Sequence, residues 1–370
     1  MKKISIGLIV AILVVSFGWL FFTKQAKKEE TVIIGVNLPL TGGYSYWGEE
    51  FKRGLDLYYT NQDSTYFKLF IEDNQGKPAN AVNVAKKLIS VNSVDAIITM
   101  FAPFSYPLRD LSTEYKIPVI TTFNTVGNFT DGFSYCFCDY LKHKPQLQLL
   151  VDYICEQNFR NGASICLTDE YGTEGARIFK ELFSEHDGKI VEELMFNYGS
   201  LSDVRNMVLK SLSPNPDFIF LIAKDIDLIS IINNIRERNL NIPIFGLGTF
   251  DAPTIWEGVP VDYQKNIFFT SSYFDKDFNE ESRLFFNSYA EKYNKQPDAP
   301  AVFSYTICQY VSKSILNAKN NNLEVLNELL SVDYESIRGH LMMNDSRNVL
   351  SATALYQRNN NQSEVIKVVE

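Results

Sequence analysis

The residues that could perform chemistry are few and far apart in this sequence of 370 residues. His143, His186 and His340 are too dispersed to indicate a metal site or a histidine base. The adjacent acids Asp169 and Glu170 could act as a catalytic pair, although neighbouring carboxylates on a loop are more often solvated. No Gly-x-Ser-x-Gly, His-Glu-x-x-His or Gly-x-x-x-x-Gly-Lys-Ser/Thr motif occurs. We therefore predict a protein that is not an enzyme and that holds no metal or cofactor.

The five cysteines also indicate little chemistry. Cys166 lies in an apolar run and Cys308 in an apolar helix, so we expect both to be small buried side chains. A bridge from Cys136 to Cys138 or to Cys155 is the alternative in an oxidising compartment. One Cys-x-Cys without a second pair is a poor metal site.

The charge and the length of the chain limit its partners and its architecture. The net charge of −9 argues against nucleic acid as a main partner, because phosphate binding needs a basic surface. A content of 45% hydrophobic and 21% charged residues is typical of a soluble globular chain. At roughly 150 residues per domain, the length predicts about two domains.

A hydrophobic segment opens the chain. Ile4–Phe22 carries no charge and would form a helix of about 28 Å, close to the thickness of a bilayer core. We expect residues 1–30 to form an uncleaved signal anchor and a polar tether, with the rest of the protein in the periplasm or at the cell surface. A signal peptide cleaved near Ser16–Gly18, which would release a secreted protein, is the alternative.

The first stretch after this segment predicts a strand, a glycine loop and a helix. Val32–Leu38 is an apolar, β-branched run that suits a strand of a parallel sheet, and Gly42–Gly43 belongs to the loop that ends it. Glu49 and Glu50 are expected in the first turn of the helix, where negative charge suits the helix dipole. Because small ligands bind at the carboxyl edge of such sheets, Trp47 on the loop is a candidate wall of a binding site.

Strands and helices then alternate in two consecutive runs, which indicates βαβ units and two lobes of parallel sheet. The strands expected after the first lie at 67–72, 95–100, 118–121, 163–168, 190–196, 218–222, 243–246 and 267–270. The expected helices are one opened by Pro78, one capped by Ser202, and those at 108–115, 146–158, 174–186, 225–238, 280–292 and 302–318. A hairpin of 352–356 with 365–368 should end the chain.

Several motifs, taken in order, resemble the type I periplasmic binding proteins, in the leucine/isoleucine/valine-binding branch that serves ABC importers. The opening Ile33–Gly42, followed by Trp47-Gly48, is similar to the first strand and loop of that family. Further similar motifs are Glu72–Ala81 with Lys87–Ile89, Lys116–Ile120, and Asp169–Gly172 with Glu174-Gly175. The resemblance extends over residues 31–357.

The resemblance implies an α/β fold of two doubly wound parallel-sheet lobes joined by a three-strand hinge. The expected lobes are residues 31–142 plus 272–345 and residues 143–271 plus 346–370. The expected crossings between them lie near 138–145, 271–275 and 345–351. Closure of the lobes would bury a small ligand between them.

Ligand contacts are implied at matching positions. Trp47 matches a pocket-wall tryptophan, and Thr125 matches a threonine that holds the ligand carboxylate. Tyr171 matches an aromatic residue of the second lobe. Thr249 and Asp251 lie in the loop that supplies an acidic partner for an ammonium group, and a carboxylate such as Asp251 suits that role.

One departure from the family pattern affects the expected ligand. Where the amino-acid binders have a serine-rich stretch, this chain has Phe101–Ser105, so that Ala102, Phe104 and Ser105 would line the pocket with one hydroxyl. Lys224 is a further candidate contact, at a position where relatives tend to have glycine. The pocket is therefore expected to be apolar and aromatic, and an amino acid is only one candidate ligand.

Structural roles are the alternatives for these residues. Trp47 could pack its loop against the core, and Tyr171 could brace its own glycine turn. Asp251 and Ser105 could each cap a following helix. Lys224 could be a solvated lysine at the start of a helix.

The sequence thus predicts an extracytoplasmic solute-binding protein. It would capture a small organic ligand between two lobes and deliver it to the permease subunits of an ABC importer. A ligand-sensing module of the same fold, which signals to a membrane receptor or kinase, is the alternative.

Overall fold

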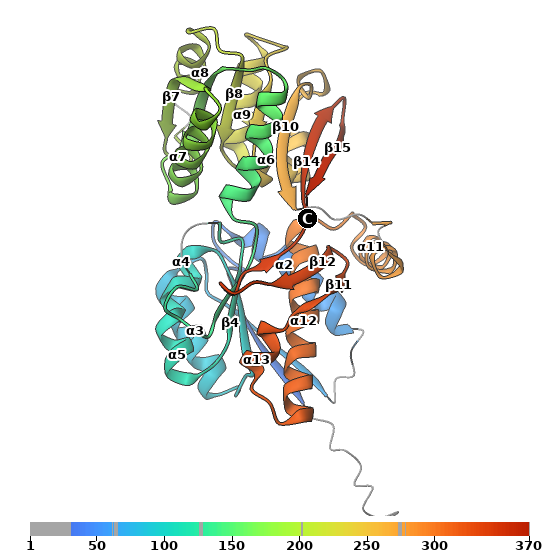
Figure 1. Ribbon diagram of the computed structural model, residues 1–370. Helices are drawn as coiled ribbons and strands as arrows, with labels where there is room; N and C mark the ends of the chain where they lie inside the picture. The colour runs from blue at the N-terminus through green and yellow to red at the C-terminus, as the bar shows by residue number, and fades with distance from the viewer. Residues whose placement is uncertain are drawn as a thin grey trace, which may run out of the picture.

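The computed structural model describes residues 31–60, 62, 66–125, 129–200, 203–272, 276–277 and 279–369. The predicted anchor at Ile4–Phe22 and the predicted cap Ser202 lie outside these residues. Figure 1 shows two lobes, one above the other, each built around its own sheet. Within the described ranges, no helix has both the length and the apolar character that a membrane span requires.

The first lobe contains a five-stranded sheet in the order β2-β1-β3-β4-β5, in which every pairing is parallel. Its central strands are buried on both faces, as their uninterrupted apolar runs predict. The strands are β1 (Val32–Leu38), β2 (Phe67–Asp73), β3 (Ala96–Met100), β4 (Val119–Thr122) and β5 (Cys136–Asp139).

Helices cover both faces of this sheet. α2 (Ser45–Thr60) and α12 (Ala299–Asn321) pack on one face, where Phe51, Leu55 and Phe303 belong to one apolar core. The other face is covered by α3 (Pro78–Ser90), α4 (Ala102–Ser105), the 3-10 helix Tyr106–Leu108 and α5 (Arg109–Tyr115). Two more helices, α11 (Glu280–Tyr293) and α13 (Val325–Leu330), pack beside α2 and α12.

The second lobe contains a seven-stranded sheet in the order β15-β14-β10-β9-β8-β6-β7. Five neighbouring strands are parallel: β6 (Asn161–Leu167), β7 (Lys189–Phe196), β8 (Phe218–Ile222), β9 (Ile244–Gly246) and β10 (Ile267–Ser272). The predicted hairpin is confirmed and adds β14 (Thr353–Asn359) and β15 (Gln362–Val369) as antiparallel strands. Apolar cores lie on both faces. The helices are α6 (His143–Glu156), α7 (Glu170–Glu185), α8 (Val204–Leu212), α9 (Asp225–Arg236) and α10 (Pro253–Glu257).

The chain passes between the two sheets three times. It leaves the first sheet after β5 and enters α6 within four residues, and it returns between β10 and α11. The last passage follows a small antiparallel sheet of β11 (Asp333–Ser336), β12 (Gly339–Met343) and β13 (Val349–Leu350). Because β13 pairs with β12, the chain reaches β14 of the second sheet through residues 351–352.

Several sequence expectations need correction. α2 begins at Ser45, so Glu49 and Glu50 lie in its second turn and Trp47 lies in the helix rather than on the loop. The helix expected at 108–115 is preceded by α4 and a 3-10 turn. β5 and the sheet of β11–β13 were not predicted, because short strands with polar residues carry a weak apolar signal.

The cysteines form no disulfide among the described residues, where all five are free. Cys166 and Cys308 are buried, as predicted, and Cys136 and Cys138 are buried in β5. Successive residues of a strand point to alternate faces, so burial of both Cys136 and Cys138 on one face fits a packing role for each.

Candidate functional site

The candidate site lies at the junction of the lobes, where strands end at their carboxyl edges. In the first sheet the strand order reverses between β1 and β3, and Trp47 and Phe101 follow these strands. In the second sheet it reverses between β6 and β8, and Tyr171 and Lys224 follow them. Ligands of open α/β sheets bind at such reversal points. The two sets of loops meet at Gly248, where an added Cβ would lie 3.4 Å from the hydroxyl of Tyr140.

The first lobe contributes a continuous set of aromatic rings, which we call the aromatic wall. Trp47 lies with its ring centroid 5.8 Å from Phe101 and 5.3 Å from Phe123. Phe123 continues to Tyr140 at 4.8 Å, so the set runs from α2 to the first passage between the lobes. Trp47 and Tyr140 are half-buried, so each keeps accessible surface at the junction. The wall consists of Tyr44, Trp47, Phe101, Phe104, Phe123, Tyr140 and Phe303.

Two residues of the aromatic wall have unusual backbone conformations. Phe101, directly after β3, has φ 62° and ψ 145°, and Phe123, directly after β4, has φ 52°. A bulky residue with positive φ is strained by roughly 1–3 kcal/mol, and such strain is concentrated at functional sites. In these backbone conformations, both rings contact Trp47.

The second lobe contributes polar groups to the junction. The ring of Tyr171, in the first turn of α7, packs on His143 with centroids 4.9 Å apart. The pKa of the Tyr171 phenol is raised mainly by burial, and Tyr140, across the junction, raises it further. The Thr249 hydroxyl faces the Tyr171 phenol but makes no hydrogen bond of ordinary geometry.

Asp251 is the carboxylate at the centre of the junction. It ends the 3-10 helix Gly248–Asp251, and the Ser271 hydroxyl donates a hydrogen bond of 2.8 Å to its Oδ2. Its pKa is raised to about 6, mainly by burial and to a smaller extent by the negative charge of Asp298 in the opposite lobe, while the hydrogen bond from Ser271 acts in the other direction. The predicted alternative, a helix cap, is wrong for this residue, because the N-cap of α10 is Ala252.

Other predicted residues are engaged within the protein. Lys224 lies at the start of α9, partly exposed, where it forms an ion pair of 3.0 Å with Asp169 and lies over the ring of Tyr198, so its ammonium is already engaged. Ser105 is fully buried in α4, and its hydroxyl donates to the Phe101 carbonyl at 2.9 Å. It therefore caps no helix and has no free donor for a ligand.

The remaining predicted residues lie near the same strand ends. Phe104 is buried within the aromatic wall, and Ala102 is half-buried beside it. Thr125 is 8% exposed, three residues after β4. Because Thr125 is mostly buried, its hydroxyl could contact a ligand only at the edge of the wall.

Sequence reasoning missed two residues of the junction. Tyr140 follows β5 and lies against Phe123 and Phe303, and its pKa is raised by burial and by the charge of Asp251. Asp298, directly before α12, accepts a hydrogen bond of 2.7 Å from the Tyr46 hydroxyl. Its position before an apolar helix was the only available signal. Across the described residues, no three His, Cys, Asp or Glu side chains form a metal-binding group.

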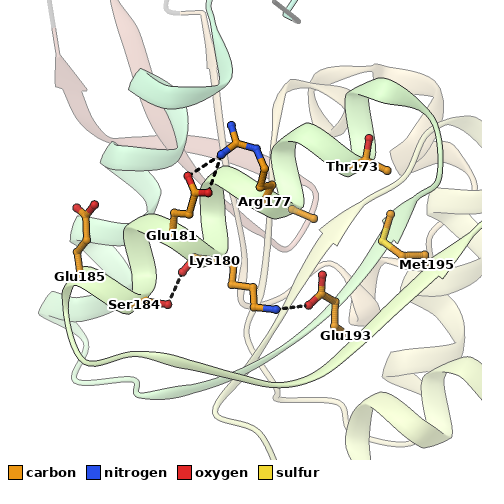
Figure 2. Close-up of a pocket in the computed structure, with 9 residues that line it drawn as sticks. Thr173, Arg177, Lys180, Glu181, Ser184, Glu185, Glu193 and Met195 are labelled. Atoms are coloured by element: carbon orange, nitrogen blue, oxygen red, sulfur yellow. Dashed lines mark hydrogen bonds and ion pairs between the residues drawn. The ribbon is translucent and has the colours of Figure 1, made fainter.

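A separate depression of about 760 Å³ on the second lobe is not part of this site. Figure 2 shows that it lies between α7 and β7, where charged side chains pair with one another. Arg177 pairs with Glu181 at 2.6 Å and Lys180 with Glu193 at 2.7 Å, and all four are exposed. Solvated ion pairs of this kind contribute little energy and offer a small ligand no desolvated partner.

Comparison with known proteins gives one family and a set of similar structures. Residues 31–362 match the family described as periplasmic binding protein. None of the curated proteins with which the chain was compared matches it.

The similar structures are solute-binding proteins. LivJ of Streptococcus pneumoniae, a branched-chain amino acid transporter substrate binding protein in complex with isoleucine, is 21% identical with a TM-score of 0.81, over 91% of this chain and 100% of LivJ. The leucine binding protein LivK of Thermotoga maritima is 19% identical with a TM-score of 0.81, over 92% and 99%. A solute binding protein of an ABC transporter from R. palustris, in complex with benzoate, is 19% identical with a TM-score of 0.79, over 91% and 96%. At these identities the likeness concerns the fold.

Proposed function

The chain belongs to the periplasmic binding protein family, and on that premise we propose that it binds a small organic solute at the junction of its lobes and delivers it to an ABC importer. Membership of this family implies a location outside the cytoplasm and a binding role rather than catalysis. Docking on permease subunits and attachment to the membrane through residues 4–22 belong to the proposal.

The observation that supports this proposal is the aromatic wall opposite Asp251, a carboxylate whose side-chain partner is the Ser271 hydroxyl. Trp47 and Tyr140 supply accessible apolar surface from the first lobe, and Asp251 and Thr249 supply polar groups from the second. An apolar lining with a few convergent polar groups is typical of small-molecule sites. The similar proteins hold isoleucine and benzoate, which are small organic solutes of this size class.

The proposed cycle follows from three passages between two separate cores. Each lobe has its own sheet and cores, so the lobes can rotate as rigid bodies about the passages. A ligand that contacts both lobes stabilises the closed arrangement, because only that arrangement makes both sets of contacts. The closed form would be the one that docks on the permease.

A thermal-shift screen of the full-length chain in detergent tests ligand binding. The panel contains amino acids, amides, short peptides, amines and aromatic acids, and a ligand at 100 times its Kd should add about 2.7 kcal/mol of stability. The screen fails, and the proposed function with it, if no solute stabilises the protein.

Trp47→Ala tests the location of the site. Because the variant removes a large, half-buried member of the aromatic wall, it should weaken ligand binding by about tenfold or more. Trp256→Phe is the matched control, because Trp256 lies in a core of the second lobe. An unchanged thermal shift in Trp47→Ala would place the ligand elsewhere.

The identity of the partner separates transport from sensing. Cross-linking of the liganded full-length chain in native membranes should recover permease subunits. Recovery of a receptor or kinase would favour the sensing alternative.

A further inference from the structure

The charges at the lobe junction are unequally compensated. Asp169 is paired with Lys224 at 3.0 Å, and Glu50 with Lys295 at 2.6 Å. In the described part of the chain, Asp251 has no such basic partner, and the Ser271 hydroxyl is the donor to it. A carboxylate removed from water without a cation is costly, so this position favours a ligand that supplies one.

A second carboxylate faces the first from the opposite lobe. Asp298 precedes α12 and is 8% exposed, and the Tyr46 hydroxyl donates to one of its oxygens, while the other has no partner of ordinary hydrogen-bond geometry. Its negative charge acts on Asp251 across the junction. The ammonium of Lys295, 5.9 Å from the ring centroid of Tyr46, offsets part of the Asp298 charge. Asp251 is therefore the carboxylate of the two that a ligand cation would compensate.

The aromatic wall suits the same kind of ligand. Trp47 contacts Tyr46, whose hydroxyl is bound to Asp298, and it connects through Phe123 to Tyr140, which lies against Gly248. Ring contacts therefore connect the residue bound to Asp298 with the loop that carries Asp251. The faces of Trp and Tyr rings attract ammonium groups and also pack on apolar bodies.

Three side chains that could have bound a ligand carboxylate are engaged within the protein. The Ser105 hydroxyl is bound to the Phe101 carbonyl, and Lys224 is bound to Asp169. Lys142, at the first passage, donates to the Asn124 carbonyl at 3.3 Å and contacts the buried Cys138 sulfur at 3.5 Å, so its ammonium is directed into the first lobe. None of these groups lies free opposite Asp251.

We propose that the site selects an organic cation: an amine with an apolar or aromatic body and no carboxylate, whose ammonium binds Asp251 and lies toward Asp298. The inference rests on the proposed function and names its ligand class. It departs from amino acids and aromatic acids, the ligands held by the similar proteins. The ligand would also join the lobes, because its cation neutralises Asp251 of the second lobe while its apolar body packs on the aromatic wall of the first.

Four matched probes test the inference on the unaltered full-length chain by titration calorimetry: 2-phenylethylamine, phenylalanine, 3-phenylpropionate and 2-phenylethanol. They share a phenyl ring on a short chain and differ in charge. The amine should bind at least about tenfold tighter than each of the others, as expected for a desolvated ammonium against a carboxylate. Tighter binding of phenylalanine or phenylpropionate overturns the inference.

Variants then assign the charge to its residue. Asp251→Asn should weaken binding of the amine by about 30-fold or more and leave the alcohol unaffected. Asp262→Asn, in an exposed segment of the same lobe, and Lys142→Met should leave amine binding unchanged. If Asp251→Asn does not fold, the comparison of the four probes on the unaltered chain still tests the preference for a cation.

The outcomes separate this inference from the proposed function. If the chain binds other solutes of the screening panel but none of the amines, the cation inference is wrong and the proposed function stands. If it binds no solute at all, the proposed function is wrong as well.

Discussion

At the scale of single residues, Asp251 combines a position at the junction with an unusual pKa. Burial raises its pKa to about 6, against a value of 3.8 in the unfolded chain. The folded protein therefore binds this proton more tightly than the unfolded chain does. The stability that the group contributes is present below about pH 4 and is lost as the pH rises to about 6.

Asp251→Asn should remove this loss. An asparagine does not ionise. At pH 7.5 the free energy of unfolding of the variant should therefore be about 1–3 kcal/mol higher than that of the unaltered protein, and at pH 4 the two values should be similar. Urea denaturation at the two pH values measures this difference. Asp262→Asn, which replaces an exposed carboxylate, is the control and should change the free energy of unfolding little at either pH. Equal stabilisation by Asp251→Asn at both pH values would contradict the assigned pKa.

At the scale of elements, the contact between α2 and α12 holds the first lobe together. Gly54 of α2 lies so close to α12 that an added Cβ would be 2.1 Å from the Ala301 carbonyl oxygen. Trp47 of α2 and Asp298, which directly precedes α12, both lie near the junction. The packing of one helix pair therefore sets the spacing of two parts of the candidate site.

Gly54→Ala should destabilise the protein although alanine is the better helix former. Helix propensity alone favours the change by about 1 kcal/mol, whereas the clash with the α12 backbone should cost more, with a net loss of about 2 kcal/mol. Thermal unfolding measures the sign. Gly43→Ala is the control, because its Cβ would meet no atom within 4 Å. A more stable Gly54→Ala protein would show that the helices can move apart freely.

At the scale of the whole molecule, the passages between the lobes determine how the site can close. Near the first passage, Asp139 and Arg338 form a buried ion pair of 2.8 Å, and the guanidinium lies 4.0 Å from the ring centroid of Phe303. Burial raises the pKa of Asp139, and Arg338 lowers it. The pair fixes the end of β5 directly before Tyr140, so rotation must begin after Asp139.

Ligand binding should change the distance between the lobes but not within one lobe. Spin labels on Lys86→Cys of α3 and Glu185→Cys of α7, both at exposed positions, report the first distance. Labels on Lys86→Cys and Glu114→Cys report the second, and the partly exposed Cys155 is replaced by Ser in both. Saturating ligand should shift the first distribution by several ångström, as expected for hinge closure. An unchanged first distance would mean that the lobes bind ligand without rotation.

Local patterns were sufficient where a single segment contains the whole signal. The apolar runs of β1 and β8 and the hairpin of β14 and β15 were predicted from residues that lie next to one another. Pro78 opens α3 as predicted, because the missing N–H of proline costs nothing at a helix start. β5 could not be predicted in this way, because its four residues become a strand through pairing with β4.

The sequence by itself determined the two α/β runs, which follow from periodicity and turn residues. The resemblance of its motifs to a known family indicated the family and the candidates Trp47, Tyr171 and Asp251. The tertiary structure decided which of these groups are free to bind a ligand. It paired Lys224 with Asp169, turned Ser105 onto its own helix, and set Asp251 opposite Asp298 and Tyr140. The physical reason is that the charge environment of a side chain depends on neighbours that are distant in the sequence, and only the folded chain brings them together.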